Sequence, residues 1–313
     1  MRLSRPLRWT AAALFSAIAA ACGARSALLV DERALGEGGS GGGPAEDAGL
    51  DAADAADAQD AEPDVVIVDC QEAGIPYVYL VTSENNLYSF NPGDGSLILR
   101  GAISCPGTAA NPFSMGVDRQ GTAYVLFGDG QIFRVSTLDA SCEATDFAPG
   151  QLGFNLFGMG FSTDEGGPTE TLYVAEINFN APSLGLASID VGDFDLTYIG
   201  SFSENPGNAI EMTGTGDGRL FGYFINSAGP GGVVVEIDKQ TADILSSTPL
   251  PAGGAGSSLA FAFWGGDFYI FTSQGGGTTE VNRYSPGDGS VSFFTTLPQT
   301  VVGAGVSTCA PQQ

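Results

Sequence analysis

The acidic side chains that could do chemistry in this chain lie mainly in Gly-rich turns. The motif PGDGS occurs at Pro92–Ser96 and again at Pro286–Ser290, each time between apolar runs. A calcium loop of the EF-hand type needs carboxylates at alternating positions and a distal Glu, and neither copy has them. The segment DVGDFD, which begins at Asp190, also lacks that Glu. Because Asp-Gly is a strong signal for a tight hairpin turn, we interpret these segments as turns and expect no metal site.

Two carboxylates on predicted inner strands make glycoside hydrolysis the most specific catalytic hypothesis. That reaction needs two carboxyl groups about 5–10 Å apart around the scissile bond. Glu211 and Asp118 lie about four residues apart along equivalent strands, which corresponds to roughly 13 Å. This separation is too long for an acid–base pair. We therefore expect Asp118 to cap the DRQG turn and Glu211 to be a hydrated channel residue or the partner of an arginine such as Arg219.

Composition argues against most other catalytic centres. The chain has no His, which removes Ser–His and Cys–His nucleophiles, imidazole bases and His-ligated zinc. It has no G-x-S-x-G, P-loop or dinucleotide-binding motif, and Lys239 lies in a predicted exposed turn. With 36 Asp and Glu against 11 Lys and Arg, the surface should repel phosphate backbones. We expect no catalytic residue, no cofactor and no nucleic-acid partner.

The elements that position these residues repeat about every 45 residues from Tyr77 onward, a spacing typical of propeller blades. Each unit contains a six-residue turn that follows one short apolar strand and precedes another. The five turns are 91–96, 137–142, 190–195, 238–243 and 285–290. The strand that starts four of the units has its fifth copy at the C-terminus, as VGAGVS at Val302–Ser307. We therefore expect the C-terminal strand to complete the first blade and close the ring.

The predicted fold is all-β: a five-bladed β-propeller of four-stranded blades. The blades are 77–104 plus the C-terminal strand, 111–148, 156–203, 208–251 and 257–298. Successive side chains of a strand point to opposite faces. In the innermost strands one set is small or polar, as at Gly158 and Gly160, and the other is apolar, as at Met159 and Phe161. We expect the small set to line the narrow axis and the apolar set to pack blade against blade.

The N-terminus has the organisation of an export signal. A basic segment with Arg2, Arg5 and Arg8 precedes the apolar run Trp9–Ala21, which is too short to span a bilayer comfortably. The run ends in IAAAC, which resembles the lipobox of bacterial lipoproteins. The resemblance implies lipidation of Cys22, and the Gly that follows resembles the pattern of outer-membrane lipoproteins. The alternative is an ordinary signal peptide with an incidental Cys.

Residues 23–69 are predicted to be a disordered linker between the signal segment, residues 1–22, and the propeller domain, residues 70–313. The first part of the linker is Gly-rich, and the second part, rich in Asp and Ala, has no apolar face to bury. We expect an outer-membrane lipoprotein that is held by its N-terminal lipid anchor. The propeller would be monomeric and would face the periplasm or the cell exterior.

Four cysteines remain after Cys22, and an even number in an exported chain suggests disulfides. Cys309 follows the C-terminal strand and Cys70 precedes the next strand of the same blade, so we predict the pair Cys70–Cys309. The pair Cys105–Cys142 then follows by elimination. Its expected geometry is unfavourable, because Cys105 leaves an outer strand while Cys142 ends a turn toward the opposite face. Reduced thiols are the alternative.

Several longer segments carry a family resemblance that extends over nearly all of residues 77–311. They are NPFSMGVDRQGTAYVLF, FGMGFSTD, TGTGDGRLFG, FWGGDFY and VVGAGVSTCAP. In these segments the chain resembles a group of uncharacterised bacterial lipoproteins. The resemblance implies a propeller and a cell-envelope setting, and it implies no activity.

One face of the predicted propeller collects neutral amides, because three lengthened second–third strand connections share it with the blade-to-blade crossovers. The candidate ligand face comprises Asn155, Asn178, Asn180, Asn205, Asn208, Asn226, Gln274 and Glu211. Amides near aromatic side chains suit a sugar or a peptide, although loops are commonly polar. We expect a non-catalytic binding or scaffold module for a protein or glycan. The alternative is a glycan-active hydrolase that uses Glu211 in the propeller channel.

Overall fold

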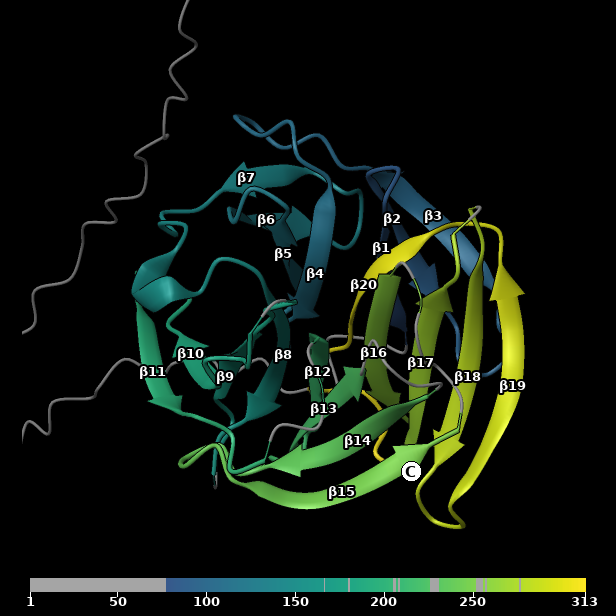
Figure 1. The fold of residues 1–313 in the computed structure, drawn as a ribbon. Helices are drawn as coiled ribbons and strands as arrows, with labels where there is room; N and C mark the ends of the chain where they lie inside the picture. The colour runs from purple at the N-terminus through teal and green to yellow at the C-terminus, as the bar shows by residue number, and fades with distance from the viewer. Residues whose placement is uncertain are drawn as a thin grey trace, which may run out of the picture. The chain divides into compact units, whose positions relative to one another are not determined.

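The computed structural model describes residues 77–313 apart from 166, 180, 205–206, 208, 226–230, 252–255, 257 and 276. The chain divides into two units, Met1–Glu62 and Pro63–Gln313, and the described residues belong to the second. They form five four-stranded antiparallel sheets arranged in a ring (Figure 1). This is the predicted five-bladed β-propeller. The predicted signal segment, the linker and Cys22 lie outside the described residues.

Each blade is one sheet, and its four strands follow one another from the axis outward. Blade 1 contains β20 (Val301–Gly305), β1 (Val78–Thr82), β2 (Asn86–Phe90) and β3 (Leu97–Ala102). Blade 2 contains β4 (Pro112–Val117), β5 (Thr122–Phe127), β6 (Ile132–Ser136) and β7 (Cys142–Ala144). After the short 3-10 helix η1 (Gln151–Gly153), blade 3 contains β8 (Phe157–Thr163), β9 (Glu170–Glu176), β10 (Leu186–Ile189) and β11 (Leu196–Gly200). Blade 4 contains β12 (Ala209–Gly214), β13 (Leu220–Ile225), β14 (Gly232–Ile237) and β15 (Ile244–Leu250). Blade 5 contains β16 (Ser258–Trp264), β17 (Asp267–Ser273), β18 (Thr279–Ser285) and β19 (Ser290–Leu297).

The C-terminal strand closes the ring, as predicted. β20 pairs antiparallel with β1, so that Tyr79 lies opposite Gly305 and Val81 lies opposite Gly303. β20 also lies against the inner strands β16 and β4 of the two neighbouring blades. The last strand of the chain therefore provides the inner strand of the first blade and fills the gap between the last blade and the second.

The third and fourth strands of every blade are joined by the same kind of six-residue turn. In each turn the backbone N–H of the fifth residue donates to the carbonyl oxygen of the first, at 2.8–2.9 Å. The fifth residue always has a positive φ; these residues are Gly95, Ala140, Phe194, Ala242 and Gly289. A side-chain oxygen of the fourth residue accepts a hydrogen bond from the backbone N–H of the sixth. The five predicted turns are therefore structurally equivalent.

The turn of blade 2 begins one residue earlier than predicted. The repeated hydrogen bonds place it at Ser136–Ser141 and not at 137–142. Ala140 has the left-handed φ, 60°, that Gly has in both PGDGS copies, and an alignment guided by Gly therefore misses this position. In the PGDGS copies, Asp94 and Asp288 accept backbone hydrogen bonds within their own turns, which agrees with the interpretation of PGDGS as a turn.

Small residues on the inner strands let neighbouring blades approach each other at the axis, as predicted. A Cβ at Gly158 would lie 2.1 Å from the carbonyl oxygen of Ile210 on the next inner strand. A Cβ at Gly303 would lie 3.0 Å from the backbone of Ser114. The alternate apolar side chains are buried in the clusters between blades and include Met115, Met159 and Met212. These methionines are therefore core residues.

Cys105 and Cys142 form a disulfide, as predicted, with their Cα atoms 5.1 Å apart. The expected geometric obstacle does not arise, because sheet twist accumulates from the axis outward and turns the outer strand toward the next blade. A Cβ at Gly101, near the end of β3, would lie 2.8 Å from the carbonyl oxygen of Asp139 in the turn of blade 2. Cys309 is also disulfide-bonded. Its predicted partner, Cys70, lies outside the described residues, so that pairing stays a prediction.

Candidate functional site

A cavity of about 150 Å³ lies around the axis at the face where the chain passes from one blade to the next. All five blades contribute to its wall, with Val302, Phe113, Ile177, Ile210 and Leu259 from blades 1 to 5 respectively. These residues stand at the beginnings of inner strands or just after a second strand. We call this face the crossover face and the cavity the axial pocket. Phe179, which is 61% exposed, brings the rim of the pocket to the surface.

Glu211 is the single ionisable residue among the described residues that line the axial pocket. It extends from β12, is 3% exposed, and accepts a hydrogen bond at Oε2 from the Ser114 hydroxyl of β4, at 2.8 Å. Burial raises the pKa of Glu211 well above its ordinary value, although the bond from Ser114 acts in the opposite direction. The carboxyl group therefore favours its neutral acid form. The expected pairing with Arg219 is wrong, because Arg219 pairs with Glu236 at 2.8 Å.

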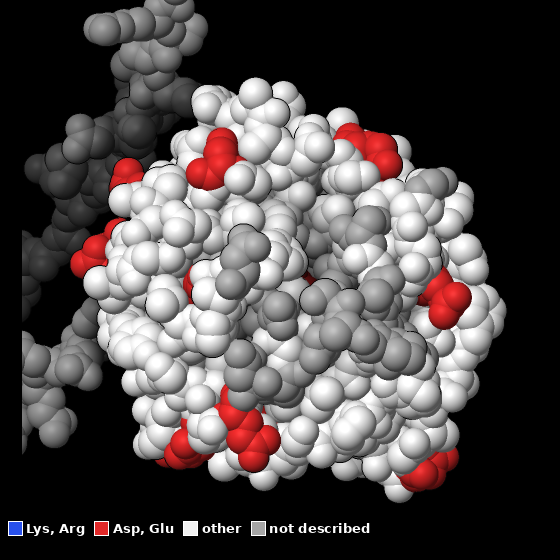
Figure 2. Space-filling model, in the orientation of Figure 1, with Lys and Arg blue, Asp and Glu red and all other residues white. Residues whose placement is uncertain are grey.

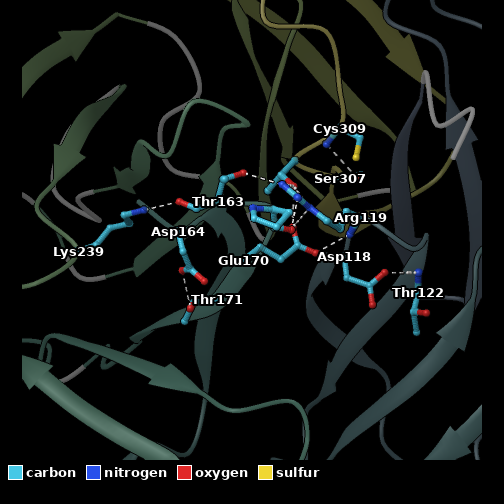
Figure 3. A network of polar contacts seen from close by, with 12 residues as sticks. Asp118, Arg119, Thr122, Thr163, Asp164, Glu170, Thr171, Lys239, Ser307 and Cys309 are labelled. Carbon is cyan, nitrogen blue, oxygen red and sulfur yellow. Dashed lines mark hydrogen bonds and ion pairs between the residues drawn. The ribbon is translucent and has the colours of Figure 1, made fainter. Parts of the chain in front are cut away.

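Asp118 does not form an acid–base pair with Glu211. It directly follows β4 and accepts a hydrogen bond from the backbone N–H of Thr122 at 2.7 Å, which is the predicted turn cap (Figure 3). Burial raises the pKa of Asp118, and the bond from Thr122 partly offsets this effect. Asp118 lies four positions beyond Ser114, the residue that contacts Glu211. At the usual rise of a strand this is about 13 Å along β4.

A buried charge network is centred on Arg119 (Figure 3). It lies at the opposite end of the axis, because Arg119 follows the end of β4, whereas Phe113 of the axial pocket stands at the beginning of that strand. The guanidinium donates to the hydroxyl of Thr163 at 3.0 Å, to that of Thr308 at 3.3 Å, and to the carbonyl oxygen of Pro168. The backbone N–H of Arg119 donates to Glu170 at 2.6 Å, and the two side chains form an ion pair at 3.7 Å. Burial raises the pKa of Glu170, partly offset by its hydrogen bonds. The network joins blades 2 and 3 to the C-terminal segment.

Neither Arg119 nor Glu170 was among the predicted site residues. Arg119 is one of six cationic residues that follow residue 76, and it stands directly after Asp118 in the DRQG turn. A scarce arginine at the end of an inner strand is therefore a signal that could have identified it.

The segment that follows β20 lies across the same end of the axis. Thr308 donates to Glu170 at 2.6 Å, and the carbonyl oxygen of Pro311 accepts a hydrogen bond from the N–H of Gly265 at 2.8 Å. A Cβ at Gly216 would lie 2.4 Å from the carbonyl oxygen of Thr308. These contacts reach the start of β9 in blade 3 and the first–second connections of blades 4 and 5. The axis is therefore covered at this end, whereas the axial pocket lies at the other.

The predicted amide-rich ligand face is described in part. Asn155, Asn178 and Gln274 lie in connections on the crossover face. Outside the described residues lie Asn180, Asn205, Asn208 and Asn226. The Asn155 amide donates to the carbonyl oxygen of Gly153 at 3.0 Å, and the Asn178 amide oxygen accepts from the N–H of Ala181 at 3.1 Å. These two amides stabilise their own loops, so the axial pocket is the stronger candidate for ligand contact.

A cavity of about 400 Å³ between blades 3 and 4 corrects the interpretation of Lys239. This residue was expected in an exposed turn, but it is half-buried, and its ammonium group donates to the carbonyl oxygen of Thr163 at 2.6 Å. Burial lowers the pKa of Lys239, while nearby acids such as Asp164 act in the opposite direction. The side chain folds back from the turn because a carbonyl oxygen and these acids lie close to it.

Charged side chains on the face shown in Figure 2 are acidic and lie mainly around its edge. Of the residues that the structure describes, no Lys or Arg is visible on this face. No three or more His, Cys, Asp or Glu residues are grouped to hold a metal ion in the described part of the chain. No described helix is long and apolar enough to cross a bilayer.

Comparison with known proteins adds a likeness of fold. No family model and no curated protein matches the chain. Kuenenia stuttgartiensis hydrazine synthase is 14% identical with a TM-score of 0.41, over 71% of this chain and 66% of that chain. The Dos1 propeller is 11% identical with a TM-score of 0.40, over 75% of this chain and 71% of that chain. The chain spans just under two thirds of the hydrazine synthase chain, and likenesses this weak carry no argument about function.

Proposed function

We propose that this protein is a cell-envelope lipoprotein whose propeller is a non-catalytic binding module for a protein or glycan, with the ligand on the crossover face. One observation carries the proposal: the axial pocket is an apolar cavity of about 150 Å³, bounded by all five blades, with a single buried carboxyl group in its described wall. A concave apolar site with a few polar groups is the usual form of a ligand-binding pocket. The exposed ring of Phe179 adds aromatic surface beside it.

A protein ligand fits this pocket better than a glycan. The described wall is mainly apolar, and the amides of Asn155 and Asn178 are engaged within their own loops. Burial of one large apolar side chain in such a pocket would contribute about 1.5–3 kcal/mol. A partner protein that inserts one side chain beside Phe179 would use both features of the site.

The alternative, a glycan-active hydrolase that uses Glu211, receives less support. A neutral buried acid could act as a general acid, but glycoside hydrolysis also needs a second carboxylate about 5–10 Å away. No second acidic residue lines the axial pocket among the residues that the structure describes. Asp118 is engaged in its own turn.

The binding function can be tested with two matched variants. Phe179 and Phe293 are 61% and 62% exposed, and Phe293 lies on the outer strand β19, away from the pocket. The full-length protein would be used to capture ligands from native envelope extract, with identification by mass spectrometry, and in parallel on a glycan array. Each candidate ligand would then be titrated in purified form.

We expect saturable binding that is lost in Phe179→Ser and retained in Phe293→Ser. Equal binding by both variants would contradict a site on the crossover face. Turnover of a glycan that disappears in Glu211→Gln would replace the proposal with the hydrolase.

The proposed envelope location depends on Cys22 and is tested separately. In bacterial cells, labelled palmitate should be incorporated into the wild-type chain and not into Cys22→Ala. Export with cleavage but without label would support the ordinary signal peptide instead.

A further inference from the structure

The size of the axial pocket limits what part of a ligand can enter it. Its volume is about 150 Å³. An engineered apolar cavity of about the same volume in another protein binds benzene. The axial pocket therefore has room for one ring-sized group, and not for several sugar residues.

Two polar groups of the pocket have unused hydrogen-bonding capacity. Glu211 receives the bond from Ser114 at Oε2, and its Oε1 has no hydrogen-bond partner among the described residues. Ser258, at the start of β16, also lines the pocket, and its buried Oγ has no partner in the part of the chain that the structure describes. Buried polar groups are normally paired, so the Oγ of Ser258 points to a ligand that has hydrogen-bonding groups of its own. Glu211, in the same wall, has Oε1 available for a hydrogen bond to that ligand.

The wall of the pocket favours an uncharged ligand. No cation stands in its described lining, so an anion would lose its hydration without gaining a partner. Because burial favours the neutral form of Glu211, its carboxyl group can donate a hydrogen bond, as well as accept the one from Ser114. A neutral acid has no net charge with which to hold an ammonium group.

We propose that the axial pocket binds an uncharged, ring-sized group that carries a hydroxyl, as in a phenol. This inference rests on the proposed binding function. The acid O–H of Glu211 donates to the hydroxyl oxygen of the ligand, and the hydroxyl of the ligand can donate in turn to the Ser258 oxygen. The ring contacts the apolar wall, which includes Phe113, Ile210 and Leu259.

The test uses four small aromatic probes, each titrated at pH 7 against the purified full-length protein by calorimetry or ligand-observed NMR. Phenol and toluene match in size and differ in the hydroxyl, while benzylamine and benzoate add a positive or a negative charge. We expect phenol to bind about tenfold more tightly than toluene, which is the effect of one net hydrogen bond. Benzylamine and benzoate should bind more weakly than phenol.

Variants separate the polar contacts from the shape of the pocket. In Glu211→Leu and in Ser258→Ala the preference for phenol over toluene should fall toward one, while toluene still binds, which shows that the pocket is intact. Glu211→Gln keeps a donor and should retain most of the preference. Phe293→Ser, far from the pocket, should leave all affinities unchanged.

Three results would overturn the inference: equal affinity for phenol and toluene, tighter binding of benzylamine than of phenol, or no binding of any probe. If no probe binds but a partner is still lost in Phe179→Ser, the binding function stands and only the ligand class fails. If phenol binds as expected but no partner depends on Phe179, the ligand class stands and the proposed docking on the crossover face fails.

Discussion

Glu211 and Arg119 are both buried near the axis, but their surroundings differ. Glu211 has one hydrogen bond, from Ser114, and no cation among its described partners. Arg119 donates to several hydroxyl and carbonyl oxygens and forms an ion pair with Glu170. Burial therefore favours the neutral form of Glu211. The charge of Arg119, in contrast, is compensated by the ion pair with Glu170.

Replacement of Glu211 by Gln should make the protein more stable relative to wild type as the pH rises. The pKa of Glu211 in the folded protein is raised above the ordinary 4.5 of the unfolded chain. At a pH between the unfolded and the folded pKa, the carboxyl group therefore takes up a proton when the protein folds. Wild-type stability from this group is fully present below about pH 4.5 and is lost as the pH rises, by about 1.4 kcal/mol per unit. Glu211→Gln removes this loss.

The measurement is urea unfolding at pH 4, 6 and 8, with the exposed Glu143→Gln as the control. The free energy of unfolding of Glu211→Gln minus that of wild type should increase with pH, and the same difference for Glu143→Gln should stay flat. A flat difference for Glu211→Gln would contradict the raised pKa.

Replacement of Arg119 by Met should cost about 3–5 kcal/mol of unfolding free energy, because it leaves the buried carboxylate of Glu170 without its positively charged partner. The side chains of Arg119 and Glu170 are 9% and 7% exposed. Arg219→Met breaks the pair with Glu236, in which the Arg219 side chain is 51% exposed, and should cost about 1 kcal/mol. Equal losses in the two variants, measured by urea unfolding, would contradict a structural role for the Arg119 network.

The sequence predicts the role of a residue where that role depends on neighbours that are close in the sequence. The cap at Asp118 follows from the DRQG turn, which is four residues long, and the axial position of Glu211 follows from strand alternation. The partners of Arg119 could not be predicted in this way. Glu170 lies 51 residues away and Thr308 lies 189 residues away, so only the closed ring brings them together. The unpaired hydroxyl of Ser258 likewise depends on packing around the axis.

The inner strands of the blades depend on glycine for their close approach, and this can be tested at β8. In Gly158→Ala the new Cβ would lie 2.1 Å from the carbonyl oxygen of Ile210, so β8 and β12 must separate. We expect a loss of about 3 kcal/mol or more in urea unfolding. Gly287→Ala, whose Cβ meets nothing within 4 Å, should change stability by about 0.5 kcal/mol or less. Comparable losses would argue against packing at the axis as the cause.

The third–fourth turns should be independent of calcium. Asp94 and Asp288 accept backbone hydrogen bonds from Ser96 and Ser290 in their own turns. The side-chain hydroxyl of each serine, followed by its backbone N–H, lowers the pKa of the carboxyl group. We therefore expect the same thermal midpoint in the presence of millimolar calcium and of EDTA. A rise in the midpoint with calcium would show that these turns, or other acidic segments, bind the ion.

The strands and turns were largely predictable because propeller blades repeat the same local pattern. Alternation placed the inner strands, and the spacing of the turns gave the number of blades. The error at Ser136–Ser141 arose where Ala140 takes a backbone conformation that usually signals Gly. Sequence spacing also gave an unfavourable geometry for Cys105–Cys142, because it does not convey how far an outer strand turns toward the next blade.

The whole ring depends on the joining of its two ends, and the predicted pair Cys70–Cys309 would fasten this closure. In the chain-entropy model a cross-link over more than 200 residues contributes about 5 kcal/mol. A peptide map without reductant should therefore show Cys309 joined to Cys70. A link from Cys309 to Cys22 would contradict both this pairing and the lipidation of Cys22. Cys309→Ala should unfold at a clearly lower urea concentration than wild type.

The pairing of β1 with β20 also limits the order in which the propeller can form during synthesis. Strands β1 to β3 leave the ribosome before β20 exists, so blade 1 cannot be completed until the other four blades have been synthesised. Long-range pairing of this kind slows folding. The export that we propose would require an extended chain, and this delay would keep blade 1 open until β20 has been made.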